Sequence, residues 1–256
     1  MDRIKARQLF DEYVAAYDAG IIEIKLKIDH TYRVAAIAER IAESIGADKD
    51  AAWMMGMFHD IGRFEQYTVY GTFRDAKSVD HAEYGADILF GKDERFKGVF
   101  EEWDAIAETA IRLHNKLDLP NTLDDKTMTY CNILRDADKI DIFRVITEPP
   151  YDERSRLIMT MDTPASEEVI GCVMEHRCVP RPLIHNKFEA LIGQCCMGFE
   201  LVYPESIVIT EEQGYLGKLL DLDIRDKLLR SQLEELKKEI YSVWNIRKEN
   251  RDDKKK

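Results

Sequence analysis

The stretch AAWMMGMFHDIG, residues 51–62, sets a histidine and an aspartate directly after an apolar helical segment. Ala52 and Met55 precede His59 by seven and four positions, so the three side chains share one face of the expected helix. This spacing predicts that a helix carries the polar pair His59-Asp60 into the protein interior.

Three further histidines, His30, His81 and His114, also lie on apolar faces of expected helices. A single histidine in such a position is better explained as a hydrogen-bonded core residue than as a ligand. The neighbours at helical spacing are Leu26, Val34, Ile37 and Ile41 for His30, Tyr84, Gly85 and Ile88 for His81, and Ala107, Ala110 and Ile111 for His114.

Asp138 is the clearest case of an inward-facing polar residue. Its helical neighbours are Cys131, Leu134, Ile142 and Val145. A buried, ionised carboxylate costs several kcal/mol unless it is paired, and an arginine or lysine could supply the pair. A shared metal centre, however, explains the four histidines, Asp60 and Asp138 together. Six ligands exceed the need of one ion, whereas two ions bridged by Asp60 would use them all.

With these residues in this order, the sequence resembles the HD superfamily of metal-dependent phosphohydrolases. The family pattern His…His-Asp…Asp is matched by His30, His59-Asp60 and Asp138, and His81 and His114 resemble the extra histidines of the binuclear branch. The local contexts are HTYRVA from His30, HDIGR from His59, DHAEYGA from Asp80 and LRDADK from Leu134. The resemblance implies an all-α helical bundle, in agreement with the helical periodicity.

The resemblance also implies a role for each residue. His30, His59, Asp60 and Asp138 would hold the first ion, and Asp60 would bridge to a second ion held by His81 and His114. The ions would be divalent transition metals, namely Fe, Mn, Zn, Co or Ni, with Mg as a further candidate. Asp60 and Arg63 would be the catalytic residues, with Arg63 on the substrate phosphate. A surface salt bridge is the alternative for Arg63.

The segment YGTFRDAKSVD, residues 70–80, links His59-Asp60 to His81 and has little apolar periodicity. We expect a loop that covers the site, in which Arg74 and Lys77 contact the substrate. A solvated loop without a role is the alternative.

The sequence departs from two branches of the superfamily. The branch that acts on cyclic dinucleotides carries a His-His-Glu element and then Gly-Tyr-Pro, but here Asn115-Lys116 follows His114 and no Gly-Tyr-Pro follows, which argues against cyclic di-GMP as the substrate. The nucleotidases of the superfamily place a glutamate three residues after the motif aspartate, where this chain has Arg63.

The chain-wide pattern predicts helices and almost no strands; Ser206–Ile209 is the one short strand-like run. We expect an HD core over 1–148, a helical extension of the same globule, packed on that core, over 149–250, and a charged tail over 251–256. The expected helices are one that Gly20 ends, and then about 22–45, 51–58, 80–90, 101–115, 126–147, 153–160, 165–177, 186–203, 210–220 and 224–247.

Composition limits the kinds of binding partner and the cellular location that we expect. The chain has 37 basic and 49 acidic residues and a net charge of −12, so a nucleic-acid partner is not expected. We find no signal peptide and no long apolar run, and expect no membrane partner. With five cysteines, an odd number, a reducing cytoplasm is the expected location.

These observations predict a hydrolase that acts on a small phosphate ester with a metal-activated water. Two alternatives stay open: a mixed-valent di-iron oxygenase with the same ligands, and a non-catalytic metal or nucleotide sensor. The last helix, about 224–247, favours core packing over a coiled-coil homodimer because its repeat is short.

Overall fold

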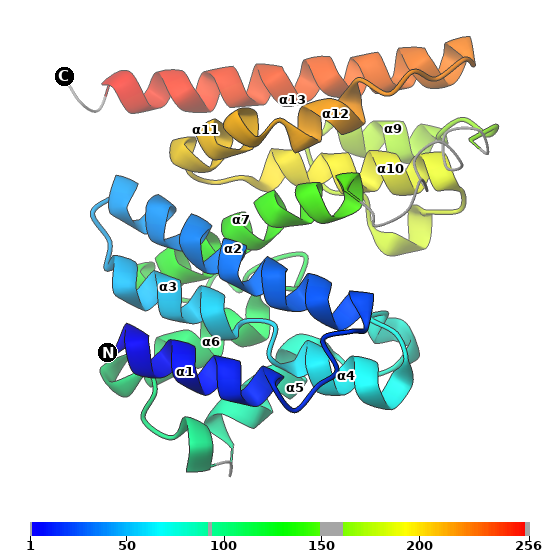
Figure 1. The fold of residues 1–256 in the computed structure, drawn as a ribbon. Coiled ribbons are helices and arrows are strands. Elements are labelled where there is room, and N and C mark those ends of the chain that lie inside the picture. The colour runs from blue at the N-terminus through cyan, green and yellow to red at the C-terminus, as the bar shows by residue number, and fades with distance from the viewer. Residues whose placement is uncertain (1, 92–93, 149–160, 254–256) are drawn as a thin grey trace. The chain divides into compact units, whose positions relative to one another are not determined.

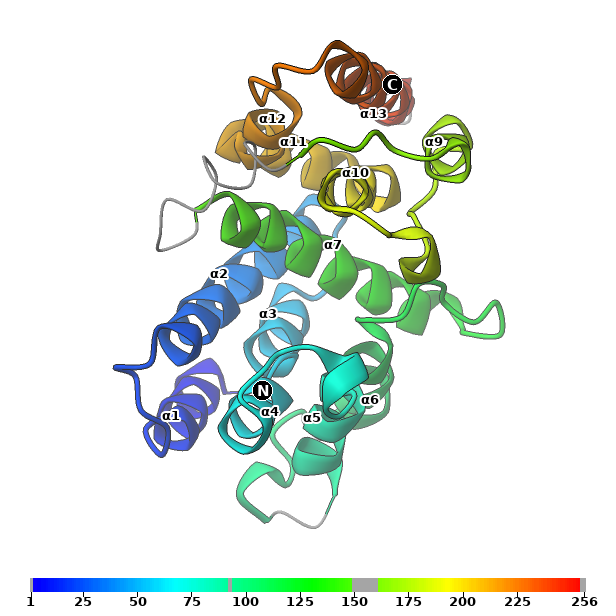
Figure 2. The ribbon, with the colours of Figure 1, turned by 90° about the vertical axis from the view of Figure 1, so that its right-hand side faces the viewer.

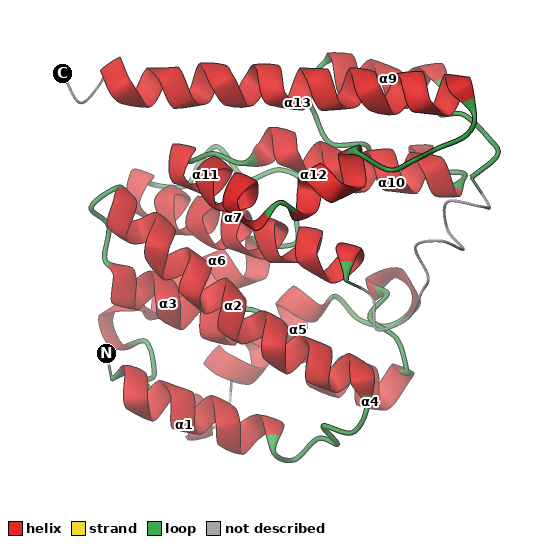
Figure 3. Cartoon of the chain, turned by 45° about the horizontal axis from the view of Figure 1, so that its top comes forward, coloured by secondary structure: helices red, strands yellow, loops and turns green. Residues whose placement is uncertain are grey.

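The computed structural model describes residues 2–91, 94–148 and 161–253, and over these residues all regular secondary structure is helical (Figure 1). No strand occurs in these ranges (Figure 3). The expected all-α fold is therefore confirmed. No helix in the described part of the chain is long and apolar enough to cross a membrane.

The chain divides into two compact units, Met1–Asp141 and Ile142–Lys256. Helix α7, Asp125–Thr147, runs across this division and gives Asp138 to the first unit. The domain limits expected at 148 and 250 stay predictions. All the residues proposed from the sequence to form the metal site belong to the first unit.

The first unit is built on the packing of α2 against α3, with α1 and α6 also on α3, and α5 between α4 and α6 (Figure 2). Large buried side chains such as Phe10, Phe58 and Phe64 fill the space between them. The helices are α1 Arg3–Val14, α2 Ile22–Ser44, α3 Lys49–Phe58, α4 Gly62–Tyr70, α5 His81–Phe90 and α6 Asp104–Leu113, with short 3₁₀ turns at Asp75–Lys77, Glu94–Phe96 and Glu101–Trp103.

Two helices in this unit differ from expectation. α1 ends at Val14, well before Gly20. α4 was not predicted, because Gln66 is buried there as well as Phe64, and a buried glutamine interrupts the apolar periodicity that marks a helix in sequence.

Two glycines let the helices of the first unit approach closely. A Cβ on Gly56 of α3 would lie 2.6 Å from the Cα of Ala35 in α2. A Cβ on Gly62, the first residue of α4, would lie 2.5 Å from the carbonyl oxygen of His81 and 2.7 Å from the amide nitrogen of Gly85. Only a residue without a side chain permits these backbone contacts.

In the second unit α13 packs against α9, α10, α11 and α12. Trp244 of α13 is buried and donates its indole N–H to the carbonyl oxygen of Gly198 at 2.8 Å. The helices are α9 Glu167–Met174, α10 Lys187–Cys195, α11 Pro204–Gln213, α12 Tyr215–Leu220 and α13 Lys227–Asp253, with 3₁₀ turns at Arg181–Leu183 and Cys196–Glu200.

One expectation for this unit was wrong, and a second concerns residues that the structure does not describe. The strand-like run Ser206–Ile209 lies inside α11, so that prediction was wrong. Pro204 starts that helix, and Ile207 and Ile209 are buried, which explains how a short apolar run imitates a strand. The helix expected at 153–160 lies outside the described residues.

We expect Gly56→Ala to lower the free energy of unfolding by about 1–3 kcal/mol, the usual range for overpacking a core. Alanine favours a helix over glycine, but its methyl group would meet the α2 backbone at 2.6 Å. Gly171→Ala in α9 is the matched control, since a Cβ there meets nothing within 4 Å, and it should stabilise by about 0.5–1 kcal/mol. Denaturant unfolding measures both, and a Gly56→Ala variant as stable as the parent would contradict the close packing.

Candidate metal centre

Six side chains from five helical segments meet in the interior of the first unit. His30 lies in the middle of α2, and Asp138 in α7. The others stand at helix ends: His59-Asp60 directly after α3, His81 at the start of α5, and His114 directly after α6. All four histidines and Asp60 are buried, with at most 5% of each residue exposed.

Local sequence sets these helix ends. Asp80 caps α5, and its carboxylate accepts the backbone N–H groups of Ala82 and Glu83 at 3.0 and 3.3 Å. This cap makes His81 the first residue of α5, with its backbone against Gly62. The glycine of the His-Asp-Ile-Gly sequence therefore decides how near His81 comes to Asp60.

The Asp60 carboxylate lies between two pairs of histidines. Its Oδ2 atom is 3.6 Å from Nε2 of both His30 and His59, which we call the first pair. Its Oδ1 atom is 3.3 Å from Nε2 of His81 and 3.7 Å from Nε2 of His114, the second pair. One carboxylate therefore presents a separate oxygen to each pair.

Asp138 adds a carboxylate to the first pair. Its Oδ1 atom is 3.1 Å from Nε2 of His30 and 3.7 Å from Nε2 of His59. Two donor atoms that each lie about 2.1 Å from one ion are about 3.0–3.4 Å apart in octahedral or tetrahedral geometry. The donor atoms around each pair thus have spacings close to those of ligands that share an ion.

The other ring nitrogen of each histidine fixes its tautomer. Nδ1 of His59 lies 2.7 Å from the carbonyl oxygen of Gly56, and Nδ1 of His114 lies 2.7 Å from that of Ile111. Because a carbonyl oxygen only accepts, both Nδ1 atoms carry the proton. In the neutral form of each ring, the Nε2 lone pair is therefore directed toward the carboxylates.

In the second pair, His81 and His114, the Nε2 atoms face each other. Nδ1 of His81 faces the Asp75 carboxylate at 2.8 Å and donates to it. The Nε2 atoms of His81 and His114 are 3.0 Å apart, so two lone pairs would face each other. A cation between them turns this repulsion into coordination.

Buried atoms without a hydrogen-bond partner support this interpretation. Within the described residues, Nε2 of His30, Nε2 of His59 and Oδ1 of Asp60 have none. A buried polar atom left unpaired costs about 1–3 kcal/mol. A divalent ion in each group of donors would satisfy all three atoms, so the residues fit a metal centre.

The protonation states also suit metal binding. Burial lowers the pKa of His81 to about 4, even though its contact with Asp75 acts in the opposite direction. Burial alone would raise the pKa of Asp60, but the Lys27 ammonium and His59 bring it well below its usual range. Asp138 behaves alike, because contacts with His30 and His59 outweigh burial. His81 is therefore neutral, and both aspartates are ionised, at neutral pH.

His30 differs from the other histidines. Burial and the Lys27 charge lower its pKa, but interactions with Asp138 and Asp141 outweigh both and leave the pKa above its usual value. Its Nδ1 atom is 2.6 Å from Oδ2 of Asp141. A metal ion at Nε2 of His30 would therefore compete with a proton.

Lys27 brings a positive charge to the bridging carboxylate. It lies one helical turn before His30, and its Nζ atom is 2.6 Å from Oδ2 of Asp60. The side chain is 13% exposed, so the ammonium meets little solvent. The cation sits at the oxygen that faces the first histidine pair.

Arg63, Arg74 and Lys77 were expected to contact the substrate. Arg63 lies in the first turn of α4, not at the end of the preceding helix as its position in the sequence suggests. Its Nε atom is 3.4 Å from Oδ1 of Asp60, and its Nη1 atom donates to Gln66, to the carbonyl oxygen of Phe73 and to Asp75. Arg74 and Lys77 are exposed on the following loop, and no contact joins them to the cluster within the described residues.

Sequence reasoning missed three residues of the site. Asp141 lies one turn after Asp138 in α7, and its fully buried carboxylate also accepts from Arg33 at 2.5 and 2.9 Å. Lys27 stands at the same spacing before His30, and this repeated spacing is a usable signal for both. Asp75 lies in a loop, where no periodicity marks it.

A third group of potential ligands, Asp75, Asp80 and His81, is explained by other contacts. Asp80 caps α5 and accepts from Asn115 and Lys116 at 2.8 and 2.6 Å. Asp75 accepts from His81 and Arg63. These oxygens already have donors, so we do not assign an ion to this group.

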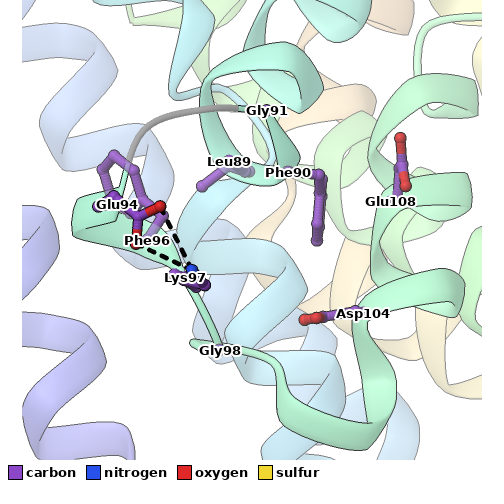
Figure 4. A pocket seen from close by; sticks show the side chains of 9 residues that line it. All are labelled: Leu89, Phe90, Gly91, Glu94, Phe96, Lys97, Gly98, Asp104 and Glu108. Carbon is purple, nitrogen blue, oxygen red and sulfur yellow. Dashed lines mark hydrogen bonds and ion pairs between the residues drawn. The ribbon is translucent and has the colours of Figure 1, made fainter.

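A separate cavity of about 330 Å³ lies by the end of α5 (Figure 4). Its polar lining consists of Glu94, Asp104, Glu108 and Lys97, and Lys97 is paired with Glu94 at 3.1 Å. A lining with three carboxylates and one paired ammonium disfavours a phosphate group. None of the six clustered side chains lines this cavity.

Fold and site together define an all-helical protein with an interior histidine–aspartate cluster suited to divalent ions. Residues 28–142 match the family model described as HD domain. These residues therefore form an HD domain, a domain that binds divalent metals and occurs mostly in metal-dependent phosphohydrolases. This confirms the resemblance. No curated protein and no solved structure matches the chain.

We expect Lys27→Met to tighten binding of a divalent ion by about tenfold, or ~1.4 kcal/mol. The substitution removes a cation that competes for Oδ2 of Asp60. Titration of the metal-free protein with Mn²⁺ measures the effect. Lys25→Met is the matched control, because Lys25 lies on the same helix in an exposed pair with Asp29, and it should leave the affinity unchanged. Equal affinities in Lys27→Met and the parent would contradict the competition.

Proposed function

We propose that this protein hydrolyses a small phosphate ester (a nucleotide, a dinucleotide, or another phosphomonoester or diester) with the help of two divalent ions. His30, His59, Asp60 and Asp138 hold the first ion, and Asp60, His81 and His114 hold the second. The observation that carries this proposal is the Asp60 carboxylate, whose two oxygens face two different pairs of histidines at 3.3–3.7 Å.

Ions in these positions would supply an activated water near neutral pH and would stabilise charge on the phosphoryl oxygens. In the hydrolysis, the water oxygen bonds to phosphorus and loses a proton, the P–O bond to the leaving group breaks, and one proton is returned to the leaving oxygen. Asp60 and Asp138 keep their negative charge throughout, because their pKa values lie well below neutrality.

Cationic side chains beside Asp60 support an anionic substrate. Lys27 Nζ lies 2.6 Å from Oδ2 of Asp60, and Arg63 Nε lies 3.4 Å from Oδ1. Phosphate oxygens that approach Asp60 therefore meet positive charge on both sides, although the whole chain carries a net charge of −12. Arg63 would contact the phosphate through Nε, because its Nη1 atom already donates to Phe73 and Asp75 of the loop. Arg74 and Lys77 would contact only the outer part of a larger substrate.

A direct test begins with elemental analysis of the purified protein, followed by a screen of phosphate esters and dinucleotides. Each assay is run with added Mn, Fe, Co, Ni or Mg, in air and without oxygen. Phosphate release that depends on metal but not on oxygen supports the proposal. Turnover that requires iron and oxygen would instead identify an oxygenase, and metal retention without any turnover would identify a sensor.

We expect Asp60→Asn to abolish phosphate release and reduce bound metal to less than one ion per chain. The amide keeps the shape of the side chain but removes the charge that both ions share. Asp87→Asn is the matched control, because the Asp87 side chain is 67% exposed in an ion pair with Arg112. Full activity in Asp60→Asn, with circular dichroism confirming the fold, would refute the bridging role.

A further inference from the structure

The four histidines differ in what holds Nδ1. His59 and His114 each donate to a carbonyl oxygen of their own preceding turn. His30 and His81 donate instead to carboxylates outside their own helices, which are Asp141 in α7 and Asp75 in the loop before α5. Each histidine pair thus contains one ring that a carboxylate orients. Such carboxylates fix the ring and strengthen it as a ligand.

The two carboxylates differ in burial and in the segment that carries them. Asp141 lies in helix α7, is fully buried, and is held by Arg33 through two hydrogen bonds. Asp75 lies in the 71–80 loop between α4 and α5, and its side chain is 16% exposed. The short 3₁₀ turn Asp75–Lys77 buries none of its residues.

Polar contacts attach the 71–80 loop to the helix before it, and Asp75 receives two of them. Its Oδ1 atom accepts from Nη1 of Arg63 at 3.0 Å and from Nε2 of Gln66 at 2.9 Å. Gln66 is fully buried and also donates to Ser78 and Val79 at 2.8 and 2.9 Å.

Asp75 therefore serves the loop and the site at once. Oδ1 secures the loop to α4, while Oδ2 receives the proton of His81 Nδ1. If the loop opens, His81 loses the partner that orients its ring. A loop with little buried apolar surface opens at a low free-energy cost, so the two events belong to one equilibrium.

We propose that Asp75 is a positioning residue that couples the second ion, the one held by His81 and His114, to closure of the 71–80 loop. The first ion, held by His30, His59, Asp138 and the shared Asp60, is independent of the loop. Two ions then bind in order, the first tightly and the second more weakly. By reciprocity, the second ion stabilises the closed loop by as much as closure strengthens its binding. This inference rests on the two-ion site of the proposed function.

Metal titrations of the metal-free protein with Co²⁺ test the coupling through stoichiometry, affinity and the visible absorption of the bound ion. We expect Asp75→Asn to weaken the second equivalent by about 10–100-fold, the range for such orienting partners, and to leave the first within about threefold. Asp141→Asn should do the reverse. Asp75→Glu keeps the carboxylate and should recover part of the second affinity.

Hydrogen exchange of the loop provides a measurement that does not involve activity. In the parent, the amides of residues 72–79 should exchange more slowly after the second equivalent of Co²⁺ but not after the first. Gln66→Leu releases the loop without touching His81, so it should speed this exchange and weaken the second ion as well. Asp87→Asn, an exposed control, should change neither.

Several results would overturn the coupling. These are equal effects of Asp75→Asn on both equivalents, no effect on either, loop exchange that ignores the second ion, or a parent protein that binds fewer than two ions. A parent that binds two ions in order but hydrolyses no phosphate ester would refute the proposed function and leave the coupling intact.

Discussion

The arrangement of the first unit depends on one buried carboxylate. Asp60 is 2% exposed, and an ionised group in such a place is stable only if charges and donors surround it. Lys27 and Arg63 supply two of these charges. The histidine rings donate through Nδ1 to other partners, so in their neutral form their Nε2 atoms bring lone pairs to this carboxylate. The cluster of lone pairs around Asp60 and Asp138 therefore has the electrostatic character of a cation site.

This carboxylate meets its partners because of two contacts between backbones. Gly56 allows α3 to lie against Ala35 of α2, which brings His59 beside His30. Gly62 allows α4 to lie against the start of α5, which brings His81 to Asp60. Both glycines flank the His59-Asp60 pair in sequence. A short motif can thus determine the packing of four helices and the geometry of the site between them.

Charge around the site is balanced locally. Asp60, Asp75, Asp138 and Asp141 bring negative charge, and Lys27, Arg33 and Arg63 lie against three of these carboxylates. Two divalent ions would leave the centre positive inside an acidic chain. This positive charge would be confined to the interior site, in keeping with the small substrate that we propose.

The sequence alone determined the helical fold and the clustered residues. Side chains at helical spacing reveal which face is buried, and a histidine or aspartate on that face is conspicuous. His30, His59, His81, His114 and Asp138 could each be placed in the interior in this way. Helix α4 was not predicted because Gln66, which donates hydrogen bonds to the 71–80 loop, is a buried polar residue. The burial of Gln66 follows from this tertiary contact rather than from local propensity.

Only the tertiary structure decided how the rings are held and what lies next to them. Asp75 comes from a loop without periodicity, so no local pattern connects it with His81. The long side chain of Lys27 could have reached solvent as easily as Asp60. The sequence predicted that Arg63 contacts the substrate phosphate, yet two of its three side-chain hydrogen bonds go to the 71–80 loop. Sequence periodicity states which way a residue faces, whereas hydrogen bonds between segments distant in sequence depend on the packing of whole helices.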